Sequence, residues 1–350
     1  MADRLLRDVN LEGDERILVL CPTDRFFLEF LEEEDHSGPI LVVDFDASRL
    51  ATIRADNSVL PNVLYTTWNL NAVKPPPRGS QPQAIFVDVD AAPSKQAGVF
   101  LVRAAASWSA GHAYVRGSRS AGMESVLREA DLAGGLAVRN VKWRKGVGLA
   151  TIAALHANLT PGRRAVLGRR KVGGQELILE NDWFTFAGGD VDAASALLID
   201  AVELKGDELV LDLGCGGGIV GLAFSRRLPD GLVVMTDANR SSVAVCQRNR
   251  LRNASLNSAV ALANGIHGLR ESVFHVVALN PPMHSGRRDD RELGEDLVEA
   301  AFTACRPGGA VYVVANRFMP YHRKMEGHGP TAELAGDSRF RVLRTVKRLT

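Results

Sequence analysis

The chain has 350 residues, more than one domain usually holds, so we expect two domains. Its 42 Lys and Arg residues balance its 41 Asp and Glu residues, which excludes a global charge that would attract nucleic acid or a membrane surface. The four cysteines form no C-x-x-C pair, and the histidines show no metal-ligand spacing, so neither a disulfide framework nor a metal site is expected. No apolar run is long enough to cross a membrane, and the expectation is a cytoplasmic protein.

Strand-like and helix-like segments alternate along the chain, as in α/β folds with a mostly parallel sheet. Two halves of this pattern match each other in order. "GDERILVLCP" (13–22) matches "GDELVLDLGCG" (206–216), and "VVDFDASR" (42–49) matches "VVMTDANR" (233–240), which pairs Asp46 with Asp237. "AIFVDVDAAP" (84–93) matches "VFHVVALNPP" (273–282), and "GHAYVRG" (111–117) matches "GAVYVVA" (309–315). Four matches in order favour duplication of one domain over chance likeness of Val-rich strands.

The two copies differ where a ligand would bind. The second has glycines at 214, 216, 217 and 218, whereas the first has Pro22-Thr23-Asp24-Arg25, which cannot bring its backbone as close to a ligand. We therefore predict that the first copy is degenerate. "RRKVGGQELILENDWFTF" (169–186) predicts a hairpin that turns at Gly173-Gly174, and the domain boundary is placed just before it, giving domains 1–165 and 166–350.

"ELVLDLGCGGGIVGLAFSRRL" (208–228) predicts a strand, a glycine loop and a helix. Gly216, Gly218 and Gly221 also satisfy the G-x-G-x-x-G of dinucleotide folds, so a dinucleotide site stays an alternative. Asp212 favours a different ligand, because a carboxylate beside the loop repels a pyrophosphate and suits an ammonium or sulfonium group.

The pattern Asp212-x-Gly214-x-Gly216-x-Gly218 resembles motif I of the class I S-adenosylmethionine-dependent methyltransferases. This resemblance implies that Asp212 lies near the methionine end of the cofactor, that Asp237 binds its ribose, and that Asn264 meets the adenine.

"LNPPMHSG" (279–286) follows the apolar run 273–278, which predicts a buried strand. Methyl transfer to an aromatic NH2 requires the amine to be oriented, because its lone pair is delocalised into the ring. The side-chain oxygen of Asn280 and the carbonyl of Pro281 can accept the two N–H groups, and Pro281 and Pro282 restrict the backbone that carries these acceptors. A plain strand-to-loop exit is the structural alternative for Asn-Pro-Pro.

With these motifs together, the chain resembles the ribosomal RNA guanine-N2 methyltransferases of RsmC type. Four stretches carry the resemblance: "FAGGDVDAASALLI" (186–199), "LDLGCGGGIVGLAF" (211–224), "NPPMHSG" (280–286) and "VANRFMPY" (314–321). It implies an α/β fold of two tandem Rossmann-like class I methyltransferase domains, the first degenerate and the second binding S-adenosylmethionine. It also implies that Asp192 and Ser195 lie in a segment that closes over the cofactor. Met283 stands where the family usually has an aromatic residue that stacks on the target base.

The 44 residues between Asp131 and Glu176 contain no acid. They predict a basic strip that contacts RNA phosphates, with Trp143 available for stacking; a solvated face is the alternative. The residues expected to bind RNA are Arg139, Lys142, Arg144, Lys145, Arg163, Arg164, Arg169 and Arg170.

The leading hypothesis is methylation of the exocyclic N2 amine of a guanine in ribosomal RNA, most directly that of the small subunit, by a monomer. Asn280, Pro281, Pro282 and Met283 form its catalytic corner. A protein glutamine-N5 methyltransferase is a second hypothesis, since Asn-Pro-Pro also grips a planar amide. A non-catalytic RNA-binding or ribosome-assembly protein is a third.

Overall fold

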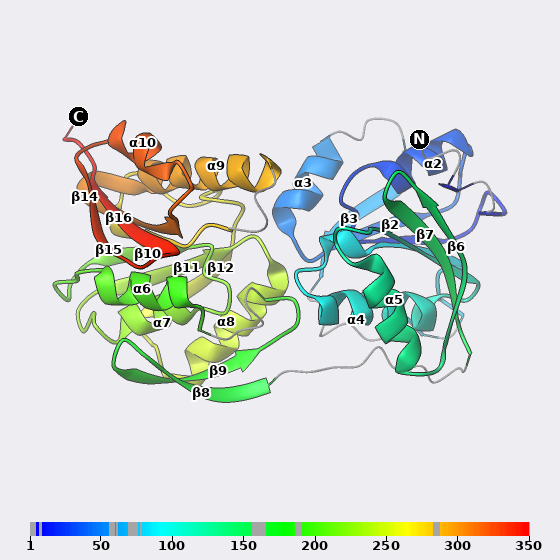
Figure 1. The fold of residues 1–350 in the computed structure, drawn as a ribbon, viewed down its shortest axis with the longest axis horizontal. Helices are drawn as coiled ribbons and strands as arrows, with labels where there is room; N and C mark the ends of the chain where they lie inside the picture. Colours follow the sequence, from blue (N-terminus) through cyan, green and yellow to red (C-terminus); the bar gives the residue numbers. More distant parts are fainter. Residues whose placement is uncertain are drawn as a thin grey trace. The chain divides into compact units, whose positions relative to one another are not determined.

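The computed structural model describes residues 5–6, 9–55, 60, 62–68, 76–77, 79–155, 166–185, 191–282 and 288–349, without the side chains of 166, 181 and 288–291. The chain divides into two compact units, Met1–Arg164 and Ala165–Thr350. We refer to them as the N-terminal and the C-terminal unit (Figure 1).

The N-terminal unit contains one seven-stranded sheet with helices on both faces. Its strands are β1 (Ile17–Leu20), β2 (Ile40–Asp44), β3 (Val63–Thr67), β4 (Ala84–Asp88), β5 (His112–Ser118), β6 (Leu136–Arg144) and β7 (Val147–Ala154). Its helices are α2 (Phe26–Glu33), α3 (Ala47–Ala55), α4 (Lys95–Trp108) and α5 (Met123–Leu132), with a short 3-10 turn, η1 (Val89–Ala91).

The C-terminal unit begins with a hairpin of β8 (Val166–Val172) and β9 (Gln175–Asn181). Its sheet consists of β10 (Leu209–Leu213), β11 (Leu232–Asp237), β12 (Ser258–Leu262), β13 (Phe274–Leu279), β14 (Cys305–Asn316), β15 (Thr331–Gly336) and β16 (Phe340–Val346). The helices are α6 (Ala193–Ala201), α7 (Ile219–Ser225), α8 (Arg240–Arg252), α9 (Arg288–Ala304) and α10 (Tyr321–Glu326).

Both sheets have the same topology. Their orders are β3-β2-β1-β4-β5-β7-β6 and β12-β11-β10-β13-β14-β16-β15, so each strand of one sheet has a counterpart nine strands later in the other. In each sheet, the first five strands of this order pair in parallel, and the last two join by antiparallel pairing, β7 with β5 and β6, and β16 with β14 and β15. This confirms the predicted fold class of two tandem Rossmann-like units.

The strand registers correct the residue matching made from sequence. Leu20 lies beside Val43 in the first sheet as Leu213 lies beside Thr236 in the second. The counterpart of Asp237 is therefore Asp44, not Asp46. Asp46 instead accepts hydrogen bonds from the first turn of α3. The two aspartates of "VVDFD" are two residues apart, and sequence alone could not tell the strand end from the helix cap.

The same comparison shifts the match at the fourth strand. Leu20 lies beside Val87, and Leu213 lies beside Leu279. The residues that follow, Asp88 and Asn280, are therefore counterparts.

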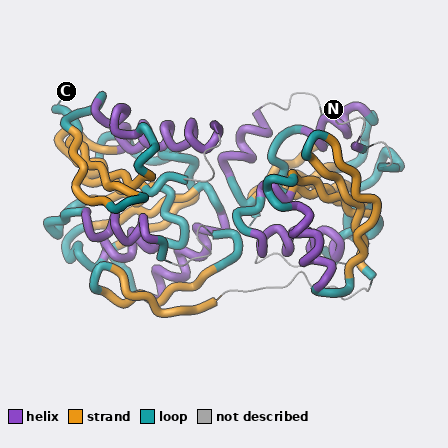
Figure 2. Tube along the Cα trace, in the orientation of Figure 1, coloured by secondary structure: helices purple, strands orange, loops and turns teal. Residues whose placement is uncertain are grey.

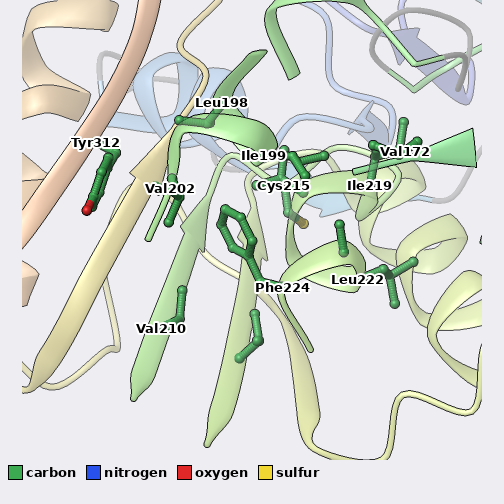
Figure 3. Close-up of a cluster of buried hydrophobic side chains, with 14 of the residues drawn as sticks. Val172, Leu198, Ile199, Val202, Val210, Cys215, Ile219, Leu222, Phe224 and Tyr312 are labelled. Carbon is green, nitrogen blue, oxygen red and sulfur yellow. The ribbon is translucent and has the colours of Figure 1, made fainter. Parts of the chain in front are cut away.

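The core of the C-terminal unit lies on both faces of its sheet. Helices α6, α7 and α8 cover one face and α9 and α10 the other (Figures 1 and 2). Figure 3 shows part of the first layer, where Leu198 of α6, Val202 just after this helix and Phe224 of α7 pack beside Val210 of β10 and Tyr312 of β14. Buried apolar packing thus fixes α6, whose first turn reaches the site described below.

Asn249 of α8 and Asn253, the C-cap residue of this helix, bond to the backbone of β9 as a neighbouring strand would. Asn249 accepts from the Glu180 N–H and donates to the Glu180 carbonyl, and Asn253 does the same with Ile178. One helical turn spans about 5.4 Å and two strand residues about 6.8 Å, so side chains four apart on α8 match alternate residues of β9. Asn249 also donates to the carbonyl of Gly217, which links the hairpin to the glycine loop. The predicted turn at Gly173-Gly174 is confirmed, with φ values of 54° and 75°.

Replacing Asn249 with alanine should lower the free energy of unfolding by about 2–4 kcal/mol, because it leaves buried backbone groups at Glu180 and Gly217 without partners. Urea denaturation measures this loss. Gln247→Ala, at an exposed position of the same helix, serves as the control and should change stability by less than about 0.5 kcal/mol. Equal stability of the two variants would contradict the role given to Asn249.

Among the described residues, no helix is long and apolar enough to cross a membrane. All four cysteines are buried and free.

Candidate active site

The residues predicted to form the site follow parallel strands of the second sheet. Asp237, Asn264 and Asn280 lie at or just after the ends of β11, β12 and β13, and the glycine loop follows β10. Carboxyl ends of parallel strands share one edge of a sheet, and ligands of open α/β sheets bind there. The structure therefore brings the predicted residues to one edge.

The glycine loop needs its glycines for two different reasons. Gly214, Gly216 and Gly218 have φ values of 73°, 54° and 88°, in the left-handed region that glycine tolerates. A Cβ on Gly218 would lie 2.6 Å from the sulfur of Cys246, so this glycine also allows the loop to pack on α8. At Gly214 a Cβ would meet nothing within 4 Å, so the space above this residue is open.

Asp237 holds the loop in place. Its Oδ2 accepts from the Gly216 N–H at 2.8 Å and its Oδ1 accepts from the Asn239 N–H at 2.7 Å. A carboxylate accepts hydrogen bonds only, so Asp237 presents acceptors at the end of β11. Asn264 is exposed beside it, one residue after Ala263, whose N–H binds the Asp237 carbonyl.

Asp212 lies beneath the loop and is buried. Its Oδ2 accepts from the Gly221 N–H at 2.8 Å, so it fixes the first turn of α7. Burial raises the pKa of Asp212 to about 7, the Gly221 N–H opposes this rise, and the nearby charge of Asp237 adds to it.

Asp212→Asn should raise the free energy of unfolding above neutral pH by roughly 1–3 kcal/mol. The folded-state pKa of about 7 exceeds the ordinary aspartate value of 3.8, so the folded state binds this proton more tightly than the unfolded chain does. The parent therefore loses stability as the pH rises from about 4 to about 7, whereas asparagine keeps the bond to Gly221 without ionising. Denaturation curves across this range measure the difference, and a constant difference between the two proteins would contradict the assignment.

Asn280 is held by the first turn of α6. Its amide nitrogen donates to Asp192 Oδ2 at 3.3 Å and to Ser195 Oγ at 3.1 Å. Asp192 is also the N-cap of α6, where its Oδ1 accepts from the Ser195 N–H at 2.7 Å. A carboxylate cannot donate, so it fixes which end of the Asn280 amide faces α6.

The other end of this amide has no partner. Asn280 Oδ1 is buried and accepts no hydrogen bond from any residue that the structure describes. Buried acceptors are almost always satisfied, so an acceptor that the described residues leave unsatisfied, at a sheet edge where ligands bind, is a candidate to receive an N–H of a ligand. Sequence reasoning placed Asp192 and Ser195 near the cofactor but missed their contact with Asn280. The D-x-x-S spacing of a helix cap was the available signal.

Pro281 is buried and Pro282 half-buried, directly after Asn280. Met283 lies outside the described residues, so its predicted place in the catalytic corner stays a prediction.

In the N-terminal unit, the chain itself occupies the corresponding positions. Asp44, the counterpart of Asp237, is buried and receives two hydrogen bonds from the guanidinium of Arg49 at 2.7 and 2.6 Å. Asp88, the counterpart of Asn280, accepts from Thr23 and from Arg116. Burial raises the pKa of Asp88 to about 6, and the charge of Arg116 opposes this rise.

The first strand of this unit ends differently as well. Cys21 follows β1 as Gly214 follows β10, and it keeps a left-handed φ of 52° without being glycine. The left-handed residue after the first strand is thus kept in the N-terminal unit, although Asp44 and Asp88 of that unit already bond to Arg49 and Arg116.

The predicted basic residues fall into separate places. Arg139, Lys142, Arg144 and Lys145 lie together on β6 and the turn that follows it, at the edge of the first sheet. Trp143 is half-buried against Gly148 and has the guanidinium of Arg119 4.6 Å from its ring centroid, so its ring is already engaged within the protein.

The remaining basic candidates belong to the region around the hairpin. Arg169 lies on β8 and pairs with Glu176 across the hairpin at 2.6 Å, and Arg170 donates to the Arg169 carbonyl. Arg163 and Arg164 lie outside the described residues.

Comparison with known proteins identifies the C-terminal unit. Residues 176–344 match the family described as the methyltransferase small domain. The chain is 33% identical over 165 residues to the ribosomal RNA small subunit methyltransferase C of Hahella chejuensis, covering 46% of this chain and 47% of that protein. It is 34% identical over 147 residues to the ribosomal RNA large subunit methyltransferase G of Streptomyces avermitilis, covering 42% and 39%. The chain thus spans less than half the length of these relatives.

A solved structure shows the same fold over both units. It is the 16S ribosomal RNA N2 methyltransferase RsmC of T. thermophilus in complex with S-adenosylmethionine and guanosine, with a TM-score of 0.82, 22% identity, and coverage of 99% of this chain and 91% of that one. This likeness confirms the two-domain methyltransferase fold. Residues 176–344, which include the glycine loop, Asp237 and Asn280, are thus the part of the chain that is similar to the methyltransferase small domain.

Proposed function

We propose that the chain is an S-adenosylmethionine-dependent methyltransferase of RsmC type that modifies the exocyclic N2 amine of a guanine in ribosomal RNA. The observation that carries the proposal is Asn280 Oδ1, a buried acceptor at the ligand edge of the sheet that no described residue satisfies, on an amide whose nitrogen is held by Asp192 and Ser195. The names of the relatives and of the structurally similar protein support ribosomal RNA as the substrate class and the small subunit as its source.

The site residues fit the cofactor. Space is open above Gly214, Asp237 places a carboxylate at the end of β11 for a ribose hydroxyl, and Asn264 is exposed at the next strand end, where an adenine would meet it. Asp212 supplies negative charge beneath the loop once it is ionised. When bound, S-adenosylmethionine supplies an activated methyl group on a sulfonium, so no metal is required.

The residues of the chain act by orientation. In this proposal Asn280 Oδ1 accepts one N–H of the guanine amine, and the carbonyl of the next residue, Pro281, accepts the other. Two acceptors in the plane of the amine aim its lone pair out of that plane, toward the methyl group. The amine loses its extra proton to water after transfer, so no strong base is required.

We assign RNA docking to the N-terminal unit, with Arg139, Lys142, Arg144 and Lys145 as phosphate contacts. In this unit Arg49 and Arg116 bond to Asp44 and Asp88, the counterparts of Asp237 and Asn280. We therefore propose that this unit binds RNA rather than the cofactor. We also propose that the protein acts as a monomer. A ribosomal RNA substrate implies action in the cytoplasm.

Incubation with radiolabelled S-adenosylmethionine and either ribosomal RNA or cell protein tests the proposal. The expected product is N2-methylguanosine in small-subunit ribosomal RNA, identified by mass spectrometry of nucleosides. Label in glutamine side chains would instead establish the protein methyltransferase, and RNA binding without label in any product would establish the non-catalytic alternative.

A further inference from the structure

An exposed aromatic residue lies near the candidate site and has no role in the chemistry described above. Phe318 is 73% exposed, the only phenylalanine among the large apolar side chains found exposed in the described part of the chain. It follows β14 in the turn formed by residues 316–319, which is closed by the bond from the Met319 N–H to the Asn316 carbonyl at 3.0 Å.

This turn lies on the side of Asn280 that faces away from the glycine loop, Asp237 and Asn264. In the sheet order, β14 follows β13, whereas β10, β11 and β12 lie on the other side of β13. Leu279 pairs with Val313, so Asn280 is level with Val314, and Asn316 extends about 7 Å further along the strand. Phe318, two residues after Asn316, therefore lies beyond Asn280 along the strand direction, on the side of β13 away from the glycine loop.

The turn is built rigidly around the exposed ring. The guanidinium of Arg317 donates to the Asp337 carbonyl at 2.6 Å and to Glu333 at 2.9 Å, and Arg341 donates to the Met319 carbonyl at 3.0 Å. Met319, the next residue, is buried. The neighbours of Phe318 are thus fixed while its ring stays in solvent, so little ordering is needed for a flat ligand to stack on it.

We propose that Phe318 stacks on the unpaired nucleotide next to the target guanine in the substrate RNA. The inference rests on the proposed function and adds to it the contact that positions the flanking strand. Stacking on aromatic side chains is the common way in which proteins hold splayed single-stranded bases. Arg339 is exposed beside the turn, where its backbone N–H binds Asp337, and it offers a cation to the adjoining phosphate.

A binding experiment tests this contact without requiring turnover. The probe is a short single-stranded RNA with one guanine and 2-aminopurine next to it, mixed with the full chain. Binding by the parent should quench the 2-aminopurine fluorescence, and Phe318→Ala should abolish the quenching and weaken binding about tenfold. Phe318→Tyr should restore both. Leu256→Ala removes a comparably exposed side chain just before β12, at the opposite edge of the sheet, and should change neither.

The outcomes separate this inference from the proposed function. Equal binding and quenching by the parent and Phe318→Ala would overturn the inference, even if the parent methylates ribosomal RNA. Loss of free guanosine binding in Phe318→Ala would also overturn it, since the ring would then contact the target base. Quenching that depends on Phe318 would support it, and if the parent then transferred no methyl group to RNA, the proposed function alone would fail. With an active parent, Phe318→Ala should raise KM for RNA more than it lowers kcat.

Discussion

Asn280→Ala is expected to lower the turnover of methyl transfer by about two to three orders of magnitude, the usual effect of deleting one preorganised polar group. The variant loses the buried Oδ1 acceptor, so the guanine amine can rotate away from the orientation that the reaction needs. Single-turnover measurement with labelled cofactor and ribosomal RNA gives the rate of the chemical step.

Cofactor binding should survive this substitution, because the glycine loop and Asp237 hold each other without contact from Asn280. Calorimetry with S-adenosylhomocysteine and the unfolding temperature provide the controls. A variant that methylates RNA as fast as the parent would remove Asn280 from the mechanism.

Asp192→Asn should lower turnover by about ten- to a hundredfold with little change in stability. Asparagine is as good a helix cap as aspartate, so α6 keeps its first turn. The side chain at 192 can then donate as well as accept, and it no longer forces the amide nitrogen of Asn280 to face α6. The fraction of molecules with Oδ1 toward the substrate should fall, and kcat should fall with it, whereas KM for the cofactor should hardly change.

Ser195→Ala is the matched comparison, because it removes the other contact to the Asn280 nitrogen and leaves the carboxylate of Asp192 in place. It should cost no more than a few-fold in kcat. If Asp192→Asn and Ser195→Ala have the same effect, the carboxylate does not set the amide orientation. If Asp192→Asn loses activity only in proportion to cofactor binding, Asp192 acts on the cofactor instead.

The repeat and the fold could be predicted because they depend on patterns that sequence carries directly. Hydrophobic runs at matching intervals predicted two parallel sheets, and the Gly173-Gly174 pair predicted a hairpin. The residue matching within the repeat failed at Asp44 and Asp88. Val-rich strands can be slid along each other in an alignment at little cost, and only the hydrogen-bonded register shows where each strand ends.

The site was predicted in its residues but not in its contacts. Asn280 was identified from the two prolines that follow it, whereas the carboxylate that orients it comes from a helix 88 residues earlier in the chain. The arginines that bond to the aspartates of the N-terminal unit could not be predicted either, since Arg116 and its partner Asp88 are 28 residues apart in the sequence. Local patterns locate strand ends and caps, and the contacts between them depend on packing of the whole unit.

The structure of the chain with S-adenosylhomocysteine and guanosine bound tests most directly whether Asn280 and Pro281 orient the planar amine of the guanine. We expect the exocyclic nitrogen of the guanine about 3 Å from Asn280 Oδ1, with the face of the guanine ring turned toward the sulfur above the glycine loop. A guanine that binds with this nitrogen pointing away from Asn280, or at a distance from the glycine loop, would contradict it.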